Sequence, residues 1–147
     1  NAPASKLRDE VAPHVHFAIY QALASPRLEI KRASAESLGG GVYKVEIGIA
    51  NTGWLGTEIS EWAQKNKIVL PLTAEISGAT LVEGAPRVKL GQLDGRVKFR
   101  VSGDAKSDGT PDRVLHSWLI RGEKGQRVTL TATHQRAGVA SAIVELP

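Results

Sequence analysis

The chain has 147 residues, a formal net charge of +4 and no cysteine. This length fits one domain with a core of its own, and the lack of cysteine excludes disulfides and thiolate metal sites. No run of about 18 apolar residues occurs, so no membrane-spanning helix is predicted. The 19 Lys and Arg residues are scattered rather than gathered in one patch, which argues against nucleic-acid binding. Methionine is absent, also at position 1, so we expect a piece of a longer protein.

Residues 5–25, SKLRDEVAPHVHFAIYQALAS, carry the one long helical pattern. Apolar residues recur at three- and four-residue steps and form a stripe: Leu7, Val11, Val15, Ala18, Ile19, Ala22 and Leu23. Pro26 ends the pattern, because a residue before proline avoids the α conformation. The sequence predicts an amphipathic helix over 5–24 that packs on the rest of the chain or forms a dimer. Removal of residues 1–24 is therefore expected to expose apolar surface and cause aggregation.

From residue 28 onward the apolar residues follow a period of two. In VYKVEIGIA (42–50), Val45, Ile47 and Ile49 alternate with polar or small residues. Further strands are predicted at 71–77, 80–83, 86–90, 96–101, 113–121, 126–133 and 138–146. The connections are Gly-rich turns such as GGG at 39–41, and 102–112 is the longest candidate loop.

This pattern predicts a mainly β fold: an antiparallel β-sandwich, immunoglobulin-like or prealbumin-like, preceded by one amphipathic α-helix. The predicted domain organisation is a helical segment over 1–26 and a sandwich domain over 27–147.

The residues that carry common chemistries do not form recognised motifs. No H-E-x-x-H sequence occurs, and His14 and His16 point about 200° apart on a helix, so no metal site or other cofactor is predicted. No G-x-S-x-G sequence occurs, and Ser117 and His116 are neighbours on a strand, which places them on opposite faces. The sequence therefore predicts a non-enzymatic module rather than an autonomous hydrolase.

The aromatic residues offer a binding alternative, because tryptophan faces stack on sugar rings. Trp62 is expected to face inward on a short helix with Ile59 and Ala63, and Trp118 to share a strand face with His116. His116 is either a half-buried histidine with one hydrogen bond or a polar group in a ligand groove. Trp54 lies on a loop and, with 102–112, is the candidate for a glycan or cell-wall-binding module.

The turn NTG (51–53) suggests a structural role for Trp54. We expect Gly53 to adopt a positive φ, which glycine tolerates, and to turn Trp54 back over the edge of the core. The competing interpretation is a docking contact. The candidate interaction surface is the set Trp54, Leu55, Trp62, His116 and Trp118.

Four segments resemble, in the same order, the C-terminal region of certain bacterial zinc carboxypeptidases of the carboxypeptidase A-like metallopeptidase family. They are APHVHFAIYQALASPRLEI, IANTGWLGTEISEWAQKNK, VKLGQLDGR and THQRAGVASAIVEL. N-T-G-W-L is the most specific, and H-x-R-A-G follows.

The resemblance implies that a zinc-dependent catalytic domain precedes this one and that the helical segment 1–26 links to it. In that family an H-x-x-E pair and a distant His hold the zinc and a Glu acts as general base, and none of these positions exists here. It implies a non-catalytic accessory domain whose partner is its own upstream catalytic domain, and a periplasmic or secreted location. The alternatives are the glycan module and, for the isolated chain, a dimer through the helix.

Overall fold

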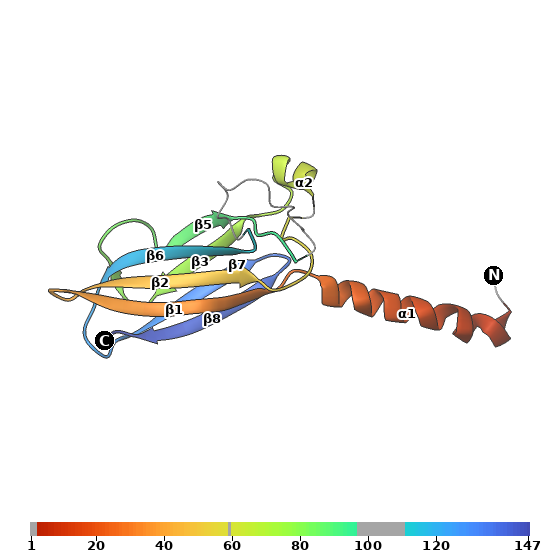
Figure 1. Cartoon of the computed structure of the whole chain (residues 1–147), viewed down its shortest axis with the longest axis horizontal. Helices are drawn as coiled ribbons and strands as arrows, with labels where there is room; N and C mark the ends of the chain where they lie inside the picture. The colour runs from red at the N-terminus through yellow and green to blue at the C-terminus, as the bar shows by residue number, and fades with distance from the viewer. Residues whose placement is uncertain (1–2, 59, 97–110) are drawn as a thin grey trace, which may run out of the picture.

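The computed structural model describes residues 3–58, 60–96 and 111–147. Two four-stranded antiparallel sheets form a β-sandwich, and one long N-terminal helix precedes it (Figure 1). The predicted fold class, a mainly β antiparallel sandwich preceded by a helix, is therefore confirmed. The predicted strand 96–101 and most of the predicted loop 102–112 lie outside the described residues.

The first sheet has the order β1-β2-β6-β4. Its strands are β1 (Leu28–Gly39), β2 (Val42–Asn51), β6 (Arg113–Arg121) and the short β4 (Thr80–Leu81). A hairpin joins β1 and β2 through Gly39–Gly41, and all three glycines have positive φ values, as the predicted GGG turn requires.

The second sheet has the order β5-β3-β7-β8. Its strands are β5 (Arg87–Gly91), β3 (Leu72–Ser77), β7 (Arg127–His134) and β8 (Gly138–Glu145). Along β7 the apolar residues Val128, Leu130 and Ala132 are fully buried, while the threonines between them are only partly buried. The period of two thus sends one face of the sheet into the core.

The core lies between the two sheets. Val45, Ile47 and Ile49 of β2 are buried against residues of β3, β6 and β7 in one cluster, as the alternation in the sequence predicts. In the register of the first sheet, Ile49 pairs with Val114 and Val42 with Arg121. The C-terminal end of β2 and the start of β6 therefore lie at the same end of the sandwich.

Helix α1 (Leu7–Ala24) follows a short 3-10 turn, η1 (Ala4–Lys6), and projects away from the sandwich (Figure 1). None of its residues is buried, so the expectation that its apolar stripe packs on the sandwich is wrong. At about 100° per residue, Phe17 and Tyr20 lie on the side opposite to the stripe, and both are exposed. The C-terminal half of the helix is thus apolar on most sides rather than amphipathic. No helix in the described part of the chain is long and apolar enough to cross a membrane.

The second helix, α2 (Glu61–Lys65), is a single short turn near the same end of the sandwich (Figure 1). It begins at Ser60, whose hydroxyl accepts a hydrogen bond from the N–H of Ala63 at 3.2 Å, a standard N-cap interaction. Ala63 faces inward, as predicted. Trp62 is 67% exposed, so its predicted inward orientation is wrong, and Ile59 lies outside the described residues.

Candidate functional site

Parts of all four segments that carry the resemblance meet at the end of the sandwich from which α1 departs. We call this the helix end and define it by residues 24–28, 51–58, 92–96 and 134–137. Backbone hydrogen bonds join its segments: Leu28 N–H donates to the carbonyl of Ala137 at 3.1 Å, and Thr57 N–H to that of Leu93 at 2.8 Å. Segments far apart in the sequence are thus held side by side.

Asn51 organises the loop that carries Trp54, and its side chain makes four hydrogen bonds. Its Oδ1 accepts from the N–H groups of Arg27 and Gly53, both at 3.0 Å. Its Nδ2 donates to the carbonyls of Leu55 at 2.8 Å and Asp94 at 3.0 Å. Asn51 is 1% exposed, and its amide has every bond that an amide of this kind needs when buried. The loop therefore has a fixed conformation.

Gly53 is required for a reason other than the one that the sequence suggests. Its φ does not lie in the left-handed region, so the prediction of a positive φ is wrong. A Cβ on Gly53 would instead lie 2.2 Å from the carbonyl oxygen of Ser25 and 2.7 Å from Cα of Pro26. Gly95 has a similar constraint, because a Cβ at that position would lie 2.2 Å from the carbonyl oxygen of Trp54. Both glycines allow backbone segments to approach closely.

His134, from the H-x-R-A-G motif, is buried beneath this loop. Its Nδ1 accepts from the N–H groups of Arg136 at 3.1 Å and Ala137 at 3.3 Å. Its Nε2 lies 3.2 Å from Oε1 of Gln92, to which the hydroxyl of Thr57 also donates at 2.7 Å. These partners fit a neutral imidazole that carries its proton on Nε2. Burial lowers the pKa of His134, and the nearby Arg136 guanidinium lowers it further, against a hydrogen bond to the Leu70 carbonyl.

Arg136 joins the H-x-R-A-G motif to the Trp54 loop. Its Nη1 donates to the carbonyls of Thr57 at 3.0 Å and Gly56 at 3.4 Å. Leu55 N–H donates to the carbonyl of Ala24 at 3.0 Å, which satisfies a carbonyl of the last turn of α1. The last turn of the helix is therefore hydrogen-bonded to the Trp54 loop.

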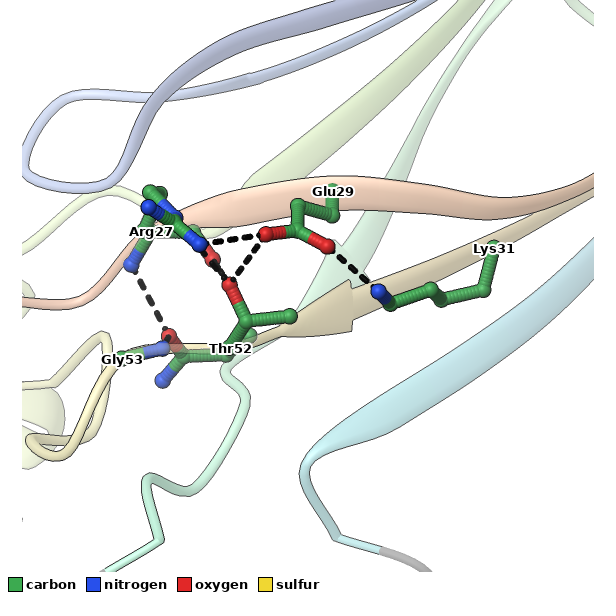
Figure 2. Close-up of polar contacts among 6 residues, drawn as sticks. Arg27, Glu29, Lys31, Thr52 and Gly53 are labelled. Atoms are coloured by element: carbon green, nitrogen blue, oxygen red, sulfur yellow. Dashed lines mark hydrogen bonds and ion pairs between the residues drawn. The ribbon is translucent and has the colours of Figure 1, made fainter.

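A charged cluster lies on the surface next to Asn51 (Figure 2). Glu29 accepts from Arg27 Nη2 at 2.6 Å, from Thr52 Oγ1 at 2.9 Å and from Lys31 Nζ. These bonds, that of Lys31 first, lower the pKa of Glu29 to about 2. Its carboxylate is thus fully paired.

Trp54 and Leu55 are at the surface of the helix end. Trp54 is 53% exposed and Leu55 is 42% exposed, so the interpretation that Trp54 folds back over the core edge is wrong. Trp54 and the last turn of α1 both line a hollow of about 390 Å³.

His116 and Trp118 form a separate group on β6. Both face the same side of the strand, as predicted, and their rings meet edge to face with centroids 4.5 Å apart. Trp118 is 4% exposed and its Nε1 donates to the carbonyl of Ala85 at 3.3 Å. Its register partner Val45 lies in the middle of β2, so this pair is not part of the helix end.

The hollow beside His116 has a volume of about 540 Å³ and is lined by residues of β2, β5, β6 and the segment before β5. Burial lowers the pKa of His116, and within the described residues its ring makes no hydrogen bond. Nowhere among residues 3–58, 60–96 and 111–147 do three His, Asp or Glu residues form a group that could bind a metal ion.

The residues that the sequence did not single out are mostly polar. Thr57, Gln92 and Arg136 hold the loop, and Arg27 and Arg96 line the hollow beside Trp54. The available signal was Asn51, a polar residue at the end of the largely buried strand β2. An amide in that position requires partners from other segments, but the sequence does not say which.

A family model described as "Domain of unknown function (DUF8731)" matches residues 27–145. No curated protein is similar enough to this chain to count as a match.

Proposed function

The chain belongs to the family of domains of unknown function DUF8731, and we propose that it is a non-catalytic accessory domain that docks on a neighbouring domain through its helix end and α1. One observation carries this proposal. The apolar residues of α1 are exposed on most of its sides, from Leu7 to Leu23. An apolar helix held in water without a partner is unfavourable, so a partner surface should cover it.

The buried polar network supports the same function. Asn51 and Thr57 hold the Trp54 loop in place before any partner binds, and His134 supports Thr57 through Gln92. A surface that is already ordered loses little conformational entropy on association. The network is thus suited to present Trp54 and Leu55 to another protein.

The resemblance to zinc carboxypeptidases suggests the identity of that partner. We propose an upstream catalytic domain of a zinc metallocarboxypeptidase in the periplasm or outside the cell. Zinc and the catalytic residues would belong to that domain, and this chain would support its folding or limit access to its cleft. A second copy of this chain, joined through α1, is the partner that we propose for the isolated chain.

The second candidate is a glycan or cell-wall-binding module. The exposure of Trp54 favours it, since a buried Trp54 could not stack on a sugar. Trp62 is also exposed, but its ring makes no contact with that of Trp54 among the aromatic pairs of the described residues.

The test compares the complete product of the gene with a form that lacks residues 1–147, against small peptides and against wall-bound or large substrates. If thermal stability and activity on small peptides fall together, the chain is an accessory domain of the catalytic unit. If small peptides are still cleaved at the normal rate and only wall-bound substrates are lost, the glycan module replaces this proposal.

A further inference from the structure

The hollow beside Trp54 lies between elements that the proposed docking surface already includes. Its walls are the last turn of α1 with Leu23, the Ser25–Arg27 segment, and the Thr52–Trp54 loop. Leu23 is 75% exposed and Trp54 is 53% exposed, so the apolar walls are open to a ligand. Its volume of about 390 Å³ lies near the lower end of the range for ligand pockets.

Backbone hydrogen bonds fix the walls of this hollow. Thr52 N–H donates to the carbonyl of Arg27 at 2.8 Å, and Arg96 N–H to that of Gly53 at 3.2 Å. Leu55 N–H joins the loop to Ala24 of the helix, and Gly53 leaves no room for a shift toward Ser25. The hollow is therefore preformed.

The charged residues that line the hollow are both arginines, Arg27 and Arg96. Arg27 already forms an ion pair with Glu29, whose carboxylate also accepts hydrogen bonds from Lys31 and Thr52. Within the described residues, the guanidinium of Arg96 has neither an ion pair nor a hydrogen bond. The hollow thus presents an apolar wall and an unused guanidinium, whose fork geometry suits a carboxylate.

We propose that this hollow is an anchor site for a protein segment in which an aromatic or aliphatic side chain lies next to an Asp or Glu. The apolar side chain packs between Trp54 and Leu23, and the carboxylate binds Arg96. Tryptophan and arginine are the residues that most often dominate the binding energy of protein interfaces. This inference rests on the proposed function, because the segment belongs to the domain that covers α1.

An acidic sugar would offer the same two groups, a ring face for Trp54 and a carboxylate for Arg96. The protein segment is favoured because one wall of the hollow is the end of α1. The exposed apolar surface of the helix continues from Leu23 toward its N-terminus, so a partner that covers the helix also reaches the hollow. A sugar would leave that surface uncovered.

The test uses the complete product of the gene, with a photo-reactive benzoyl-phenylalanine in place of Trp54 and cross-linked peptides identified by mass spectrometry. Hydrogen exchange of α1 is measured in parallel, in this product and in the 147-residue chain alone. The variant Arg96→Glu is compared with Lys124→Glu, an exposed residue of the turn between β6 and β7, at the other end of the sandwich. Sedimentation with insoluble polygalacturonate and with purified cell walls tests the sugar alternative.

We expect α1 to exchange at least tenfold more slowly in the complete product. Cross-links from position 54 should fall within a few residues of an Asp or Glu, and Arg96→Glu should lower their yield at least fivefold while Lys124→Glu leaves it unchanged. If α1 is protected but the cross-links are absent or indifferent to Arg96→Glu, this inference is overturned and the proposed function stands. An unprotected α1 overturns both. Sedimentation with the polysaccharide that depends on Trp54 and Arg96 overturns the protein segment in favour of an acidic glycan.

Discussion

Two glycines of the Trp54 loop are placed under different constraints, which gives a matched pair of variants. A Cβ on Gly53 would collide with the backbone of Ser25 and Pro26, and backbone atoms cannot move without shifting the start of β1. A Cβ on Gly56 would lie 3.1 Å from the carboxylate oxygens of Glu58, which are the flexible end of a side chain. Neither glycine has a positive φ, so steric contact alone separates them.

We therefore expect Gly53→Ala to lower the free energy of unfolding by about 1–3 kcal/mol, the usual cost of forcing atoms into a packed region. Gly56→Ala should change it by less than about 1 kcal/mol. Urea denaturation at pH 7 measures both. Equal effects of the two substitutions would show that the approach of Ser25 to Gly53 is not a constraint in solution.

His134 is a buried residue whose protonation should affect folding. Its folded-state pKa is lowered from the ordinary value of 6.5, so in the window below that value the unfolded chain binds more protons than the folded one. Stability is then fully present above pH 6.5 and is lost as the pH falls toward the lower folded pKa. Protonation of Nδ1 would also place a donor against the N–H groups of Arg136 and Ala137.

We expect urea denaturation to show a lower free energy of unfolding at pH 5 than at pH 7, and His134→Asn to reduce that difference. Asparagine keeps an acceptor for the turn and does not titrate. His116, whose pKa is also lowered by burial, accounts for the remainder, so His116→Gln is the matched control. Glu29 titrates in a separate window, from 4.5 down to about 2. An unchanged pH dependence in His134→Asn would contradict the role of His134.

Among the elements, the strands were predicted better than the Trp54 loop that follows β2. The alternation of Val45, Ile47 and Ile49 gives both the strand and its buried face, because one face of a sheet must be apolar. The turn at Gly39–Gly41 was equally clear, since glycine favours positive φ values. These features are encoded within a few consecutive residues.

The candidate site depends on contacts between distant residues, which a single sequence does not reveal. Asn51 bonds with Asp94, Thr57 with Gln92, and Arg136 with Gly56. The role of Gly53 comes from Ser25, a residue 28 positions earlier, and no local rule anticipates that contact. Trp54, Leu55 and Trp62 were placed on the candidate surface, but only the fold separates them from His116 and Trp118.

Helix α1 shows a different limit of sequence reasoning. Its stripe at three- and four-residue steps predicts a helix with one buried face, yet none of its residues is buried within the described part of the chain. Periodicity reports that a surface is apolar and does not report what covers it. The predicted stripe also omitted Phe17 and Tyr20, which make the opposite side of the helix apolar and exposed as well.

At the scale of the whole molecule, the exposure of α1 reverses the effect that the sequence predicts for removal of the helix. The core of the sandwich is closed by its two sheets and includes no residue of α1. Removing the helix should therefore take apolar surface away from the molecule rather than uncover it. The truncation should end before Gln21, because Ala24 accepts a hydrogen bond from Leu55 and Pro26 is buried at the start of β1.

We expect a chain without residues 1–20 to unfold within a few degrees of the full chain in a thermal scan and to sediment as a monomer. The full chain should associate with rising concentration, because its exposed residues Val15, Phe17 and Ile19 have no other cover. Sedimentation velocity of both chains at several concentrations checks this. A truncated chain that aggregates would mean that α1 protects the sandwich, as the sequence alone suggested. A full chain that stays monomeric at all concentrations would mean that the helix tolerates water, which removes the physical reason for a docking partner.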